Sequence, residues 1–75
     1  MEKLINILKE VFNPVEIFKQ DEIITILVDS DKNMEEKISK FSSLISNLDE
    51  EYSFRFLTKE EAKNFNFKDL GVKIY

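Results

Sequence analysis

The sequence predicts a small domain of the α+β or α/β class, with elements in the order helix, strand, strand, helix, strand, helix, strand. Two segments, 2–12 and 33–48, repeat apolar residues at the spacing of an amphipathic helix. The run Ile-Ile-Thr-Ile-Leu-Val at 23–28 has the β-branched composition of a strand. The segment Thr-Lys-Glu-Glu at 58–61 carries the signal of a helix start. We therefore expect a mixed sheet of three or four strands, two long helices and one short helix.

The first helix is expected to end before Pro14, because the residue preceding a proline is pushed out of the α region. A short strand follows at 15–19. A tight turn at Gln20 and Asp21 would join it to 23–28 as an antiparallel hairpin. Since 23–28 is apolar on both faces, we expect a central strand that is covered on both sides.

The second helix is expected to run from Asn33 to Leu48, with Asn33 and Glu36 as a capping box. Its apolar residues form one stripe along the helix. That stripe would pack on the first helix and on the central strand. The core predicted in this way contains Leu8, Ile24, Ile26, Val28, Phe41 and Leu44.

The last third of the chain alternates like a strand and then turns into a capped helix. A strand is expected at 52–57, and three aromatic residues share one of its faces: Tyr52, Phe54 and Phe56. Thr58 and Glu61 predict a capping box for a short helix. Gly71, the only glycine, is expected in a turn before a terminal strand at 72–75.

Size and composition narrow the function classes. The 75 residues leave room for one domain, 1–75, which has neither Cys nor His, so disulfides, thiolate sites and histidine metal sites are excluded. The net charge of −4 argues against nonspecific binding to nucleic acid or to anionic membranes. With no apolar run long enough to span a membrane and no secretory pattern after Met1, we expect a cytoplasmic protein.

No enzymatic chemistry is indicated. A nucleophilic triad needs an activating base, usually His, and a phosphate-binding loop needs several glycines. The chain offers no His and one Gly, so we expect no catalytic residues, no cofactor and no enzyme. One alternative stays open: Asp29 and Asp31 follow the central strand, where carboxylates could hold Mg²⁺ beside a nucleotide. Capping of the next helix is the more ordinary role of such residues.

The aromatic residues are the other candidates for a site. Strand aromatics can stack nucleic-acid bases, but such platforms come with a basic groove, which is missing here, so core packing is favoured for most of them. A domain this small often needs a partner for stability. We therefore expect a protein partner or a homodimer, with an interface that includes Phe18, Tyr52, Phe54 and Phe56. The alternative is that the third helix and residues 65–70 fold over the Phe18 face.

The layout also resembles a known family. An opening amphipathic helix is followed by VEIFKQDEIITILVDSD, a second helix, FRFLTKEEA and the ending GVKIY. From Leu4 to Tyr75 this resembles the small nucleotidyltransferase domains of prokaryotic antitoxins, in the polymerase-β superfamily. Active members bind Mg²⁺ and ATP and transfer a nucleotidyl group. Their Gly-Ser turn would fall where this chain reads FKQDE, and their paired Asp residues would fall at Asp21 and Ile23. The resemblance therefore implies a degenerate member that binds a toxin without catalysis.

The leading hypothesis from the sequence is a noncatalytic small protein that acts through protein contacts. The alternatives are the degenerate nucleotidyltransferase-like protein and the Mg²⁺ or nucleotide site at Asp29 and Asp31.

Overall fold

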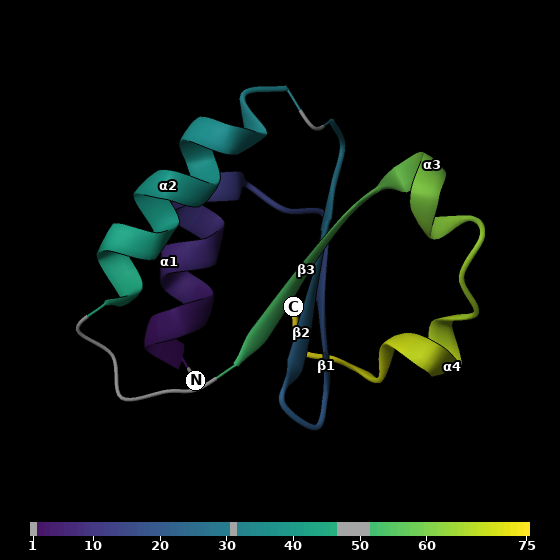
Figure 1. The fold of residues 1–75 in the computed structure, drawn as a ribbon. Helices are drawn as coiled ribbons and strands as arrows, with labels where there is room; N and C mark the ends of the chain where they lie inside the picture. Colours follow the sequence, from purple (N-terminus) through teal and green to yellow (C-terminus); the bar gives the residue numbers. More distant parts are fainter. Residues whose placement is uncertain (1, 31, 47–51) are drawn as a thin grey trace.

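A four-stranded mixed sheet lies between two pairs of helices (Figure 1). The structure is a computed structural model that describes residues 2–30, 32–46 and 52–75. Its sheet has the strand order β3-β2-β1-β4. The elements in chain order are α1 (Glu2–Phe12), β1 (Glu16–Gln20), β2 (Ile23–Val28), α2 (Met34–Ile45), β3 (Ser53–Thr58), α3 (Lys59–Ala62), α4 (Phe67–Leu70) and β4 (Val72–Lys73).

The predicted fold class is confirmed, including the hairpin and the central strand. β1 and β2 are antiparallel, whereas β2 and β3 are parallel neighbours that α2 connects. The hairpin turn lies one residue later than expected, because Gln20 still pairs with Ile23 and the turn is Asp21-Glu22. Asp21 has a φ of 53°, in the left-handed region that Asp tolerates better than most residues.

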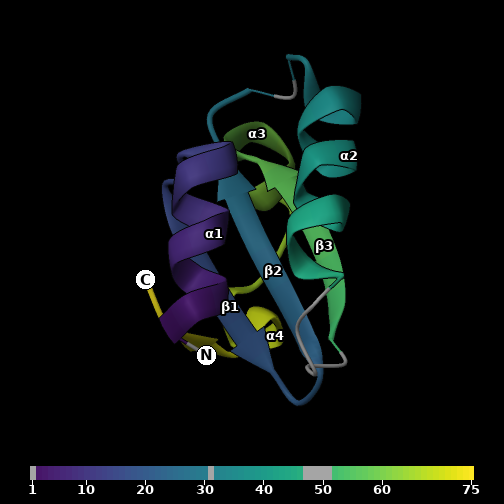
Figure 2. The same cartoon turned by 90° about the vertical axis from the view of Figure 1, so that its left-hand side faces the viewer.

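The main core fills the space between the sheet and the two long helices, α1 and α2 (Figure 2). Five of the six residues expected in this core are buried together, so the prediction is confirmed for Leu8, Ile24, Ile26, Val28 and Phe41. It is wrong for Leu44, which is 43% exposed. In Figure 2 α2 lies on the β3 side of the sheet, and β3 is the edge strand. The apolar stripe of α2 is therefore wider than the sheet beneath it.

A second, smaller core covers the opposite face of the sheet. It contains Phe18, Leu27, Leu57, Ala62 and Leu70. The short helices α3 and α4 pack on this face, and α4 is a helix that the sequence pattern did not predict (Figure 1). Phe18 is 4% exposed as a result, so the segment after β3 folds over the Phe18 side of the sheet.

The two predicted capping boxes differ in outcome. Thr58 caps α3 as predicted: its Oγ1 accepts from the Glu61 N–H at 3.2 Å, and the Glu61 carboxylate accepts from the Thr58 N–H at 3.0 Å. The prediction of a capping box at Asn33 and Glu36 is wrong. Asn33 has a φ of 59° and its side chain makes no capping hydrogen bond, whereas a capping side chain needs extended backbone to reach the helix N–H groups. The helix also ends at Ile45, and Leu48 lies outside the described residues.

Gly71 ends α4 and lets the chain return to the sheet. Its φ is +93°, and a Cβ there would lie 2.3 Å from the Lys19 carbonyl oxygen, so only glycine fits. β4 has two residues rather than four, but the chain beyond it still bonds to β1: the Ile74 N–H donates to the Ile17 carbonyl at 2.8 Å. The β1 side of the sheet is thereby closed by the C-terminal segment.

Candidate interaction surface

The open edge of the sheet is the outer side of β3. Among the described residues β3 pairs only with β2, so it is the terminal strand of the sheet. The Ser53 N–H donates to the Glu22 carbonyl at 2.8 Å, which directs the backbone groups of Ser53 toward β2. Because these groups alternate along a strand in a parallel pair, those of Arg55 and Leu57 also face β2. The N–H and C=O groups of Phe54 and Phe56 therefore point away from the sheet.

β3 has few of the features that usually protect an edge strand. Natural edges are short, bulged, covered, or carry Lys, Pro or another charged residue, and of these β3 has only the charge of Arg55. β3 spans six residues, and its sequence SFRFLT contains neither Lys nor Pro. The opposite edge strand, β4, has only two residues and includes Lys73. The two edges of the sheet therefore differ, and β3 is the one suited to accept another strand.

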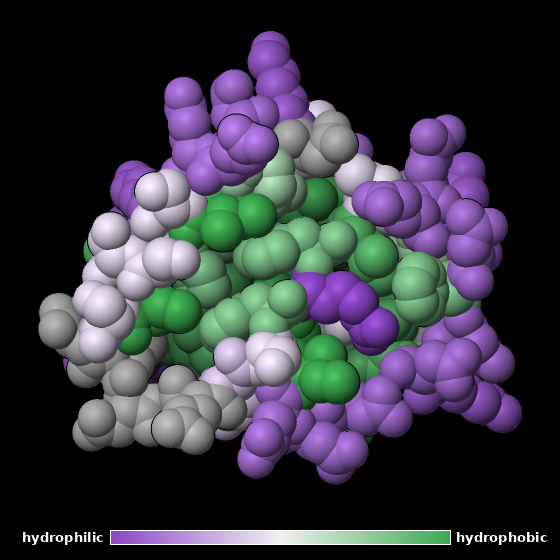
Figure 3. Space-filling view, in the orientation of Figure 1, coloured by the Kyte–Doolittle hydropathy of each residue, from purple (hydrophilic) through white to green (hydrophobic). Residues whose placement is uncertain are grey.

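Apolar side chains surround this open edge on both sides. On the α2 side, Ile38 is 37% exposed and Leu44 is 43% exposed. On the α3 side, Phe65 is 36% exposed. Figure 3 shows that apolar side chains gather across the middle of the face that carries β3, with strongly hydrophilic atoms among them, and that hydrophilic side chains border this area above, to the right and below. A contiguous apolar area with a polar rim is typical of an interaction site.

The half-buried Arg55 is the only charged residue of β3. Its Nε donates to the Oγ1 of buried Thr25 at 3.0 Å, and its guanidinium lies 5.3 Å from the centre of the Phe65 ring. These two contacts hold the side chain against the sheet. A pre-ordered arginine beside an aromatic ring is a common feature of strong protein–protein contacts.

The three aromatics predicted for the interface have their side chains on the other face of the sheet, toward α1 and α2: Tyr52, just before β3, and Phe54 and Phe56 in β3. The rings of Phe54 and Phe41 are 4.9 Å apart, and those of Phe56 and Phe12 are 4.8 Å apart. Tyr52 is also half-buried against the main core. Their side chains thus belong partly to the core, while their backbone belongs to the open edge.

Sequence reasoning found β3 but missed much of its surroundings. Phe18 lies in the second core, away from the exposed apolar area. The exposed residues that complete the area are Ile38, Leu44 and Phe65, none of which was proposed for an interface. Their apolar character at positions facing solvent was the available signal, but it could not be used before α2 and α3 were placed against the sheet.

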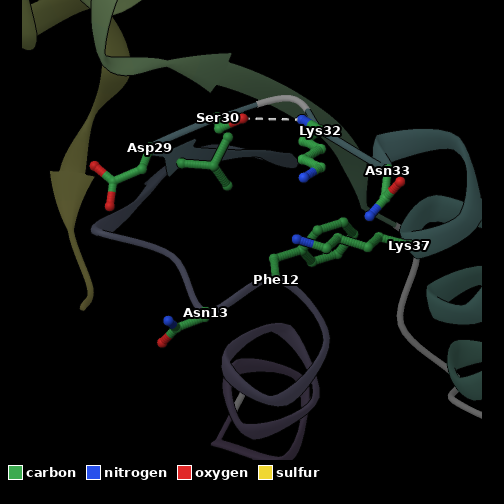
Figure 4. Close-up of a pocket in the computed structure, with 8 residues that line it drawn as sticks. Phe12, Asn13, Asp29, Ser30, Lys32, Asn33 and Lys37 are labelled. Atoms are coloured by element: carbon green, nitrogen blue, oxygen red, sulfur yellow. Dashed lines mark hydrogen bonds between the residues drawn. The ribbon is translucent and has the colours of Figure 1, made fainter.

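A second candidate is the hollow at the C-terminal end of β2, which has a volume of about 330 Å³ (Figure 4). Lys32 and Lys37 extend their amines into it, whereas the Asp29 carboxylate points away. Asp29 Oδ1 lies 3.0 Å from Lys59 Nζ, so it forms an ion pair with α3. Asp31, its expected partner in a Mg²⁺ site, lies outside the described residues. The groups that line the hollow suit an anion better than a metal cation.

The described residues contain no cluster of three or more carboxylate, His or Cys side chains that could hold a metal ion. No helix among them has the length and apolar character needed to cross a membrane.

The arrangement was also compared with known proteins. No protein-family model, curated protein or solved structure matches this chain.

Proposed function

We propose that this protein is a noncatalytic domain that works through protein contacts, made by adding a strand to the open edge of β3. The single observation that carries the proposal is the six-residue edge strand with outward-facing backbone groups at Phe54 and Phe56. In strand addition, main-chain hydrogen bonds supply affinity and the flanking side chains supply specificity. Ile38, Leu44 and Phe65 are placed to provide those flanking contacts.

The composition of the surface supports a protein partner rather than a nucleic acid. Interfaces between proteins have cores that are poor in charge and rich in aromatics and Arg. The exposed apolar area has this composition, with Arg55 as the one charge of its central strand. Nucleic acid would require several cations for its phosphates. The chain as a whole carries −4, which opposes such binding.

A nucleotide-binding role is the second candidate, and the strand-end hollow favours it. Lys32 and Lys37 could contact phosphate oxygens there, next to Ser30 and Asn33. The degenerate nucleotidyltransferase-like hypothesis places its family positions elsewhere, at Asp21 in the hairpin turn and at exposed Ile23. Its toxin-binding version needs a protein surface, and the β3 edge would serve that purpose as well.

Site-specific photo-cross-linking in the native host cell tests the proposed function. A cross-linking amino acid at exposed Leu44 should give a discrete adduct, and the same group at exposed Glu10 on α1 should not. The adduct should disappear when Ile38→Asp is introduced on the same helix. If position 44 gives no adduct above the level at position 10, the β3 edge is not a contact surface in the cell and the proposal fails.

A further inference from the structure

We infer that the strand added to the β3 edge comes from a different protein and carries an acidic residue, Asp or Glu, that pairs with Arg55. The inference rests on the proposed function and names the chemistry of its partner. It follows from the one charge of β3, because no carboxylate neutralises that charge within the described part of the chain.

Arg55 is held in place while most of its hydrogen-bond donors stay free. A guanidinium has N–H groups on Nε and on both Nη atoms. Among the described residues only Nε has an acceptor, Thr25 Oγ1 at 3.0 Å, and the ion pairs there are made by Lys59 and Lys73 instead. The Nη groups are therefore available to an acceptor from outside, and together they match the two oxygens of a carboxylate.

A strand laid along β3 removes water from this guanidinium. Arg55 is half-buried in the free chain, so water still solvates part of it. A partner that covered it with apolar groups alone would leave a buried charge unpaired, which is costly in free energy. A carboxylate at the same place avoids that cost and accepts charge-assisted hydrogen bonds, which are stronger than neutral ones. The edge therefore favours an acidic partner.

Strand geometry fixes where the acidic residue lies. Arg55 stands between Phe54 and Phe56, whose backbone N–H and C=O groups point out of the sheet. An antiparallel strand added there places the residue opposite Arg55 at a non-hydrogen-bonded position, where opposite side chains come closest. The residues on either side of it point to the other face, where Ile38 and Leu44 of α2 are exposed. The partner segment should therefore read apolar, acidic, apolar.

Charge also argues for a different protein rather than a second copy of this chain. The strand sequence SFRFLT contains no Asp or Glu, so a second copy paired through β3 would bring another arginine and no carboxylate from its strand. The net charge of −4 does not oppose an acidic partner strongly. Salt screens that charge within a Debye length of about 8 Å at physiological ionic strength, whereas the Arg55 pair is a direct contact.

Selection from a library of displayed peptides tests the inference without a known partner. The immobilised protein is exposed to a phage library of random linear peptides. We expect the enriched peptides to share one Asp or Glu with an apolar residue on each side. A synthetic copy of the most enriched peptide should bind the parent protein. Replacing its acid by the matching amide should weaken binding by about ten- to hundredfold, the range for a hydrogen bond to a charged group.

Variants of the protein show whether Arg55 is the residue that recognises the acid. Arg55→Gln keeps a donor that can reach Thr25 and should bind the acidic peptide and its amide version equally, with circular dichroism verifying the fold. Lys63→Gln removes an exposed cation at the C-terminal end of α3 and should leave the preference for the acid unchanged. The change on the peptide uses the parent protein, so that measurement does not depend on any variant folding.

Three results would overturn the inference. They are a library from which no peptide is enriched, enriched peptides that share no acidic residue, and a preference for the acid that survives Arg55→Gln. The cross-linking experiment separates these failures from failure of the proposed function. An adduct at Leu44 together with any of the three removes only the inference, whereas the absence of that adduct removes the proposed function as well.

Discussion

Arg55 and Thr25 are joined across two parallel strands, with Arg55 Nε donating to Thr25 Oγ1 at 3.0 Å. Thr25 is only 1% exposed and is the one buried polar side chain in the described core. The bond therefore satisfies a polar group inside the sheet and at the same time fixes the one charge on the open edge strand. The same hydrogen bond therefore contributes to the stability of the fold and to the geometry of the proposed interface.

Removing the acceptor should destabilise the domain. Thr25→Val keeps the shape of the side chain but leaves Arg55 Nε without its partner. We expect a loss of about 1–2 kcal/mol in the free energy of unfolding, in the lower part of the range for bonds to charged groups because the guanidinium is half-exposed. Urea titration measures it, and Thr25→Ser, which keeps the hydroxyl, should lose less. A Thr25→Val protein as stable as the parent would mean that water replaces the bond fully.

Phe41 should be the most sensitive position on α2. It is the helix's one buried residue, and its ring packs on Phe12 and Phe54 at 5.5 and 4.9 Å. Truncation of a buried Phe costs ~3–5 kcal/mol. A domain of 75 residues has about 4–11 kcal/mol in total. Phe41→Ala should therefore be largely unfolded by circular dichroism, whereas Leu44→Ala should stay folded when dilute. Equal melting temperatures for the two variants would contradict the assigned core.

The two helix caps should respond differently to mutation. Thr58→Ala removes both sides of the α3 capping box and should cost about 1 kcal/mol, while Thr58→Ser should retain most of the stability. Asn33 makes no capping bond, so Asn33→Gly, which keeps its left-handed backbone, should change stability by at most a few tenths of a kcal/mol. Thermal unfolding checks both. A larger loss at Asn33 than at Thr58 would reverse the assignment of the caps.

Millimolar Mg-ATP should leave the melting temperature unchanged if the protein works through contacts with other proteins rather than by binding a nucleotide. A ligand at a hundredfold excess over its dissociation constant stabilises by ~2.7 kcal/mol, which a thermal shift assay detects. Lys37→Ala tests a nucleotide whose phosphates contact the lysines of the hollow. The double change Asp29→Asn with Asp31→Asn tests a nucleotide held through Mg²⁺ on the two carboxylates. Stabilisation by several degrees that either change abolishes would promote the second candidate function.

Much of the fold could be predicted because local signals and tertiary packing agree. β2 matched its expected bounds, and α1 ended before Pro14, where proline chemistry requires it. The Thr58 cap was correct because its two partners lie three residues apart and need no distant contact. The short helix α4 was missed because four residues carry too little periodicity to be distinguished from a loop.

The candidate surface was harder to predict because it depends on strand order. Alternation along β3 showed which side chains share a face, but it could not show that β3 lies at an edge. The same limit explains Leu44 and Phe18. Leu44 has the spacing of a core residue but overhangs the sheet, and Phe18 looked exposed until α3 and α4 covered it. The periodicity of one element cannot reveal which neighbour will cover it.

Amide hydrogen exchange at β3 is the most direct test of the central claim. The Phe54 and Phe56 N–H groups point out of the monomer, whereas the neighbouring Arg55 N–H points to β2 and provides an internal control. We expect the Phe54 and Phe56 amides to exchange fast in the dilute protein, while the Arg55 amide stays protected. Phe54 and Phe56 amides as well protected as the Arg55 amide in the dilute protein would contradict an open edge at β3.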